Sequence, residues 1–114
     1  MIIIWHNPKC SKSREALKLL EAKGGDFAVV KYLEENPSRQ EIAALLKKLG
    51  VSARELMRTK EDLYKELGLA NETDEEKLID ALVDHPKLIE RPILIEGDRA
   101  LIGRPVEKVI EFLG

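Results

Sequence analysis

Two runs of β-branched residues near the N-terminus flank a stretch of helical periodicity, and this arrangement limits the possible folds more than any other feature. The apolar run 2–5 is typical of a strand buried on both faces. Apolar residues then recur at helical spacing over 11–23 until Gly24-Gly25, and residues 27–32 indicate a second strand. A crossover helix of this length predicts that the two strands are parallel and joined in the right-handed sense.

The middle of the chain, from about 38 to 86, has the pattern of several short helices. Ser38 followed by Glu41 forms a capping-box pattern before an apolar helical stripe. A second cap signature begins at Ser52, and Thr73 precedes the acidic first turn of a further helix. We therefore expect a helical subdomain to be inserted between the second strand and the elements that follow it.

The C-terminal part of the chain predicts a hairpin and a final helix. Apolar runs at 92–96 and 100–102 flank Gly97-Asp98, which is typical hairpin-turn chemistry. Pro105 suits the first turn of a last helix. The apolar face expected to be buried in that helix comprises Val106, Val109, Ile110 and Leu113. The resulting order is that of an α/β fold.

Composition and charge exclude several classes of protein. The 114 residues are 44% hydrophobic and 35% charged, which predicts a single domain spanning residues 1–114. A net charge of -2 argues against nonspecific nucleic-acid binding. No apolar run approaches the roughly 20 residues of a membrane span, and residues 1–5 lack the features of a signal peptide. We therefore expect a cytoplasmic protein with no membrane or nucleic-acid partner.

The only cysteine, Cys10, lies where the first predicted strand meets the first helix. One thiol excludes an internal disulfide, and one Cys with two distant His residues lacks the ligand spacing of a metal site. At a helix N-terminus the macrodipole and the backbone N–H groups of Ser11, Lys12 and Ser13 favour a thiolate. These polar surroundings indicate a reactive thiol rather than a small buried side chain.

Neighbouring residues have supporting roles in this interpretation. His6 either makes a backbone hydrogen bond at the end of the strand or tunes the pKa of Cys10. Arg14 lies four residues after Cys10, on the same helical face, where its charge would favour the thiolate; the alternative is that Arg14 is a surface or local ion-pair residue. Ser11 is interpreted as the helix cap. Ser13 stands where a dithiol centre has its second cysteine, so the reductant must come from another molecule.

Four short motifs, distributed over essentially the whole chain, resemble a known family. They are His6-Asn7-Pro8-Lys9-Cys10, Leu56-Met57-Arg58, Glu90-Arg91-Pro92-Ile93 and Gly103-Arg104-Pro105. Together with the order of the elements, they resemble the ArsC family of glutaredoxin-coupled arsenate reductases. The resemblance implies a thioredoxin-like, glutaredoxin-like fold, which has a mixed four-stranded sheet and here carries the inserted helices.

The resemblance also implies roles for individual residues. Cys10 would be the catalytic nucleophile, and Arg58, Arg91 and Arg104 would bind the oxyanion. Guanidinium groups suit that task because they are planar, permanently charged and able to donate two parallel hydrogen bonds. Pro92 would be the cis proline that thioredoxin-like folds hold beside the active cysteine. Glutathione is implied as co-substrate and glutaredoxin as partner, with no bound cofactor.

Other functions compete with this one. The phosphatase-type site requires an arginine six residues after the nucleophile, and Ala16 stands there. A monothiol, glutathione-linked oxidoreductase acting on another substrate stays open. The chain also resembles the Spx-type regulators that bind RNA polymerase, but these typically carry Cys-x-x-Cys, whereas this chain has Cys10-Ser11-Lys12-Ser13. That regulator is the least favoured of the alternatives.

Overall fold

A computed structural model describes residues 1–114, which divide into two units. We call residues 1–35 with 91–114 the sheet unit, and residues 36–90 the helical unit. The helical insertion predicted at about 38–86 falls within the helical unit. None of the helices has both the length and the apolar character that a bilayer span requires.

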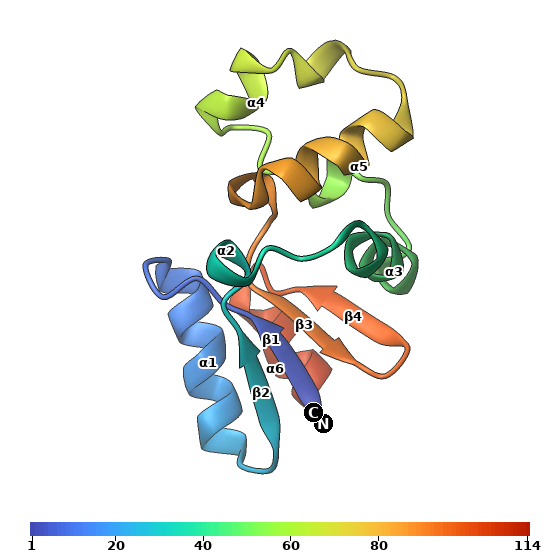
Figure 1. Cartoon of the computed structure of the whole chain (residues 1–114). Coiled ribbons are helices and arrows are strands. Elements are labelled where there is room, and N and C mark those ends of the chain that lie inside the picture. The colour runs from blue at the N-terminus through green and yellow to red at the C-terminus, as the bar shows by residue number, and fades with distance from the viewer. The chain divides into compact units, whose positions relative to one another are not determined.

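The sheet unit contains four strands and three helices (Figure 1). In chain order these are β1 (Ile2–Trp5), α1 (Ser11–Lys23), β2 (Phe27–Val30), α2 (Tyr32–Glu35), β3 (Ile93–Glu96), β4 (Arg99–Ile102) and α6 (Val106–Leu113). The strand order is β2-β1-β3-β4, with β1 parallel to β2 and antiparallel to β3, and β3 antiparallel to β4. The parallel pair and the hairpin are confirmed, as is the mixed four-stranded sheet.

The register of these strands determines which loops meet. Trp5, the last residue of β1, pairs with Ile93 at the start of β3. Ile93 in turn pairs with Ile102 at the end of β4. The loop after β1, the segment before β3 and the segment after β4 therefore lie at one end of the sheet.

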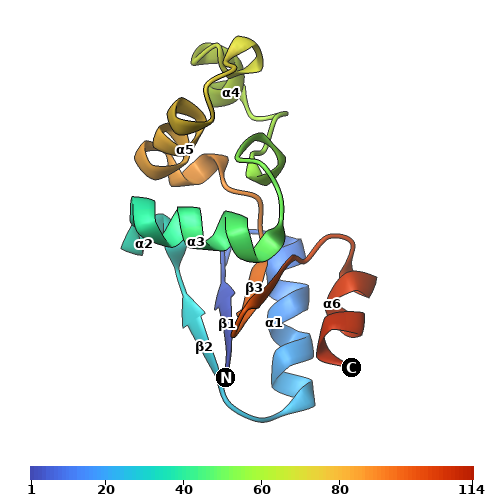
Figure 2. The same ribbon diagram turned by 90° about the vertical axis from the view of Figure 1, so that its right-hand side faces the viewer.

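Helices α1 and α6 pack side by side against one face of this sheet (Figure 2). The core between them and the strands comprises Ile2, Ile4, Ala16, Leu20, Leu94 and Val109. Ile110 was expected in this core, but its side chain is 54% exposed, so that prediction is wrong. The face of α6 that packs on the sheet contains the buried Val109 and the partly buried Phe112 and Leu113. Ile110 lies on another face of the helix, away from the sheet.

Tyr32 also differs from expectation. The alternating pattern predicted a strand through residue 32, but β2 ends at Val30 and Tyr32 begins the short helix α2. The buried Tyr32 ring stacks on Trp5 with 6.4 Å between ring centroids, while Glu34 and Glu35 donate their backbone N–H groups to the Lys31 carbonyl. Aromatic packing and this turn compete successfully with the β propensity of the run.

The helical unit contains three α-helices and three short 3-10 turns. They are α3 (Arg39–Leu49), η1 (Arg54–Leu56), α4 (Asp62–Glu66), η2 (Leu69–Asn71), α5 (Glu75–Asp84) and η3 (Pro86–Leu88). The capping box at Ser38 is confirmed, because Ser38 Oγ accepts from the Glu41 N–H and Glu41 reaches back to the Ser38 N–H. Asp74 caps α5, because its side chain accepts a hydrogen bond from the Glu76 N–H.

The second cap signature produces only one turn. Ser52 and Glu55 exchange hydrogen bonds as predicted, yet the 3-10 helix stops at Leu56. The chain becomes extended at Met57, which forms an antiparallel bridge with Ile89. Backbone pairing with a distant segment therefore ends the helix that the local pattern favours.

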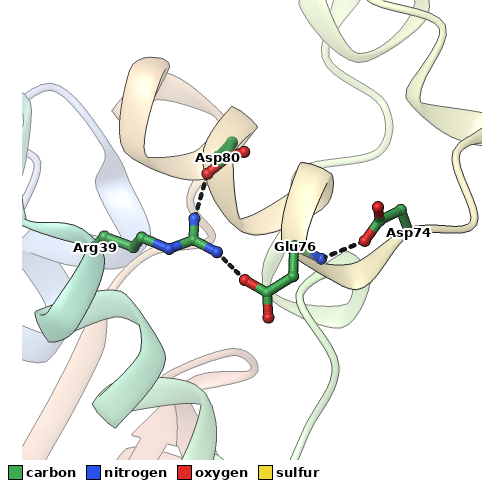
Figure 3. A network of polar contacts seen from close by, with 4 residues as sticks. All are labelled: Arg39, Asp74, Glu76 and Asp80. Carbon is green, nitrogen blue, oxygen red and sulfur yellow. Dashed lines mark hydrogen bonds and ion pairs between the residues drawn. The ribbon is translucent and has the colours of Figure 1, made fainter.

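An ion-pair network connects the first turn of α3 with α5 (Figure 3). Arg39 donates to the carboxylates of Glu76 and Asp80, and the Glu76 N–H donates to Asp74 at 2.9 Å. All these carboxylates and the guanidinium are substantially exposed. Exposed pairs of this kind contribute about 0–1 kcal/mol each, so the network orients the two helices more than it stabilises them.

Candidate active site

Cys10 occupies the N-cap of α1, at the end of the sheet where the three loops meet. Its backbone is extended, with φ -96° and ψ 124°, and its carbonyl accepts from the Arg14 N–H at 3.0 Å. Its own N–H donates to the Asn7 carbonyl at 3.0 Å. Ser11 was expected to be the cap; instead it is the first helical residue, because the turn after Pro8 makes the Cys10 carbonyl the first helical acceptor.

The thiol is partly exposed and its pKa is lowered from the ordinary value. Burial by itself raises the pKa of Cys10, but hydrogen bonds from the Ser13 and Lys12 backbone N–H groups act in the opposite direction. The charge of Arg91 and a hydrogen bond from its side chain lower the pKa further. These donors stabilise the charged form, so the site favours a thiolate.

Ser13 is fully buried beneath this loop and connects two of its residues. Ser13 Oγ accepts from the Asn7 N–H at 3.0 Å and lies 2.7 Å from His6 Nδ1. Burial lowers the pKa of His6, and the positive charges of Lys31 and Arg14 lower it further, so the ring is uncharged near neutral pH. The imidazole of His6 and the hydroxyl of Ser13 thus form a buried hydrogen-bonded pair.

Arg14 lies in a different position from the one expected. We expected the positive charge of Arg14 to act on Cys10. Instead, Arg14 Nη1 donates a hydrogen bond to the Pro8 carbonyl at 3.0 Å. The Asn7 side chain meanwhile accepts from the Lys9 N–H at 3.0 Å. The sequence analysis did not predict this hydrogen bond to the Asn7 side chain, although asparagine before proline is a common turn signal. Both contacts fix the loop that precedes the thiol.

Arg91 and Arg104 flank the β3–β4 hairpin at the same end of the sheet. The Arg91–Pro92 and Arg104–Pro105 peptide bonds are both cis, which confirms the expected cis geometry of Pro92. Buried Gly103 donates its N–H to the Pro92 carbonyl at 2.8 Å, so the segments that carry the two arginines run side by side. The sheet unit therefore places two arginines and the thiol at one end.

Arg58 belongs to the helical unit, where its backbone is firmly anchored. Its N–H donates to the Leu88 carbonyl at 2.8 Å, and the Glu90 N–H donates to the Leu56 carbonyl at 2.8 Å. Its guanidinium pairs with Glu61 at 3.0 Å. The part of Arg58 in oxyanion binding stays a prediction. Glu61 was missed, although the i,i+3 spacing is a signal for such a pair.

The arrangement in the sheet unit can hold and attack an electrophilic anion. It combines a thiol of lowered pKa with donors from the N-terminus of α1 and from the guanidinium of Arg91. No three His, Cys, Asp or Glu side chains come together as metal ligands do. A thiol at the N-cap of the first helix, at the same end of the sheet as a cis proline that precedes β3, is the arrangement of a thioredoxin-like protein.

Comparison with known proteins identifies the family. The model of the ArsC family matches residues 5–112, and the chain belongs to this family. It is 50% identical over 114 residues to the arsenate reductase of Haemophilus influenzae, with 98% of each chain covered. It is 57% identical over 113 residues to the uncharacterized protein YfgD of Escherichia coli, covering 97% of this chain and 95% of that protein.

The fold agrees with solved structures of similar sequence. The arsenate reductase from Vibrio cholerae superimposes with a TM-score of 0.92 at 50% identity, covering 96% of this chain and 95% of that one.

Proposed function

We propose that this protein is an arsenate reductase that uses Cys10 as its only catalytic thiol. The observation that carries the proposal is the position of Cys10 at the N-cap of α1, at the end of the sheet where the segments that carry Arg91 and Arg104 run side by side. Relatives that carry the name arsenate reductase, at about half identity and over nearly full length, support the choice of substrate.

In the first step the Cys10 thiolate attacks arsenic, a sulfur–arsenic bond forms, and one arsenate oxygen leaves as water. Arg91 and Arg104, with Arg58 as the third arginine of the family motifs, bind the remaining oxygens and stabilise the negative charge. Positively charged donors favour this step because the adduct keeps the charge of the oxyanion close to the sulfur.

Glutathione and glutaredoxin complete the cycle in this proposal. The glutathione thiol adds at arsenic with loss of a second water, and a glutaredoxin thiol then attacks the glutathione sulfur. Two electrons pass to arsenic, and glutaredoxin and glutathione form a mixed disulfide. Water then hydrolyses the bond between arsenic and the Cys10 sulfur, which releases arsenite and returns the Cys10 thiol. The absence of a second cysteine beside Cys10 supports an external reductant. Because reduced thiols are consumed, we place the reaction in the cytoplasm.

The proposal is tested by coupling the purified protein to glutathione, glutaredoxin and glutathione reductase. We expect NADPH oxidation that depends on arsenate, that requires glutaredoxin, and that Cys10→Ser abolishes. No oxidation above the blank would contradict the arsenate assignment. If Cys10 nevertheless alkylated rapidly near neutral pH, that result would favour a monothiol oxidoreductase with another substrate.

A further inference from the structure

Glu61 forms a carboxylate bridge between two cations of the helical unit. Its Oε2 lies 3.0 Å from Nη2 of Arg58, and its Oε1 lies 3.1 Å from Nζ of Lys87. The side chain of Glu61 is only 16% exposed and that of Arg58 25%, whereas Lys87 is 62% exposed. The Arg58–Glu61 contact is thus the more protected half of the bridge, where solvent screens the attraction less.

The backbone on both sides of this contact is fixed. Arg58 is held by its hydrogen bond to Leu88, and the Glu61 N–H donates to the Arg58 carbonyl at 3.0 Å. The Glu61 carbonyl accepts from Tyr64 at 3.0 Å, at the start of α4. Two anchored residues joined by their side chains leave the guanidinium little freedom to rotate. The ordering entropy of a long arginine side chain is therefore lost on folding and not when a ligand binds.

Glu61 contacts the guanidinium of Arg58 at Nη2. An arginine carries five N–H donors in its planar fork, more than one carboxylate can occupy, so the pair still has donors to offer an oxyanion. The negative charge of Glu61 would weaken the attraction of Arg58 for an anion, but the ammonium of Lys87 offsets that charge. The three side chains together keep a charge of +1.

We propose that Glu61 is a positioning residue for Arg58 in oxyanion binding, with Lys87 offsetting the carboxylate charge. The inference rests on the proposed function, in which Arg58 is one of the arginines that bind arsenate. It assigns a role to two residues outside the four family motifs.

The test uses double variants that keep the charge of the cluster constant. Glu61→Leu with Lys87→Met removes the anchor, while Glu61→Gln with Lys87→Met keeps a neutral acceptor for Arg58. The matched control is Glu66→Leu with Lys60→Met, which changes two exposed residues of the same unit. The measurement is the arsenate concentration that half-protects Cys10 from iodoacetamide, together with KM and kcat for arsenate.

We expect the Leu/Met pair to raise the half-protecting concentration and KM by roughly tenfold, the size of one lost charged hydrogen bond, with a much smaller change in kcat. The Gln/Met pair should stay within about twofold of the wild type, as should the control. The rate of Cys10 alkylation without arsenate should be unchanged in all three, which a general structural defect would not allow.

Wild-type protection in the Leu/Met pair would overturn the inference, as would an equal loss in the Gln/Met pair. Arg58→Met separates this failure from failure of the proposed function. If Arg58→Met loses protection while the Leu/Met pair does not, Glu61 has no positioning role. If Arg58→Met protects like the wild type, Arg58 does not bind the oxyanion, and both the inference and that part of the proposed function are wrong.

Discussion

At the scale of single residues, Cys10 owes its chemistry to donors from two distant parts of the sequence. The helix N-terminus supplies backbone N–H groups three residues away or fewer, and these were predictable from the position of Cys10 in the sequence. Arg91 reaches the sulfur only because the strand register brings the start of β3 beside the end of β1. Periodicity contains no information about that pairing, so only the family resemblance pointed to Arg91.

Replacing Arg91 by methionine should raise the pKa of Cys10, because the variant loses both the positive charge and the side-chain hydrogen bond that favour the thiolate. The pH dependence of iodoacetamide alkylation measures this shift. Arg99→Met is the matched control, since Arg99 begins β4 at the opposite end of the hairpin. An unchanged pKa in Arg91→Met would show that the helix end alone tunes the thiol.

Ser13→Ala should lower the free energy of unfolding by about 1–3 kcal/mol, because the Asn7 N–H and His6 Nδ1 lose their common partner in a buried place. Denaturant titration measures the change. Ser11→Ala removes an exposed hydroxyl from the same helix and serves as control. Equal stability of the two variants would contradict the buried role of Ser13.

The lowered pKa of His6 predicts a definite pH dependence of stability. The native state binds the proton less readily than the unfolded chain, whose histidine titrates near 6.5. The contribution of His6 to the free energy of unfolding is therefore complete above pH 6.5, and it is lost as the pH falls through the lower pKa of the native state. His6→Asn should reduce the dependence of the free energy of unfolding on pH, which urea titrations at several pH values measure. A wild-type slope in His6→Asn would assign the acid sensitivity to other groups.

At the scale of elements, the hairpin β3–β4 is flanked by two of the predicted oxyanion-binding residues, Arg91 and Arg104. Gly103 makes this possible, because a Cβ there would lie 2.9 Å from Cγ of Pro92 and 2.9 Å from Cγ2 of Val109. Both neighbours are rigid and well packed, so the segment before Arg104 needs glycine to approach Pro92 closely.

Gly103→Ala should therefore destabilise the protein by about 1–3 kcal/mol through overpacking. It should also weaken protection of Cys10 by arsenate, because the segment that carries Arg104 moves away from Pro92. Thermal unfolding and the alkylation assay check the two effects. Gly97→Ala, in the turn at the far end of the hairpin, should lower stability through its φ of +60° without altering protection. If arsenate protected Cys10 fully in Gly103→Ala, the close approach of this segment to Pro92 would not be needed for oxyanion binding.

Most elements were predictable because their signals are local. The strand 2–5, the helix 11–23 and the capping box at Ser38 depend on neighbours in sequence. The errors occurred where distant contacts prevail. Tyr32 stacks on Trp5, and the chain at Met57 pairs with Ile89, so in each case tertiary contact overrides the local pattern.

At the scale of the whole molecule, the site combines residues from opposite ends of the sequence. The proposed nucleophile, Cys10, lies in the first loop, and two of the arginines proposed to bind the oxyanion flank a hairpin near the C-terminus. This separation explains why the cysteine could be singled out from its local context, whereas the arginines could not be distinguished from surface residues without the family motifs.

The measurement that tests the account most directly is the rate of Cys10 alkylation as a function of pH, with and without arsenate. We predict a pKa below the ordinary value for a cysteine, and a rate that arsenate lowers in a saturable manner because bound oxyanion covers the sulfur. An ordinary pKa and a rate that arsenate does not change would contradict both the reactive thiol and the oxyanion site.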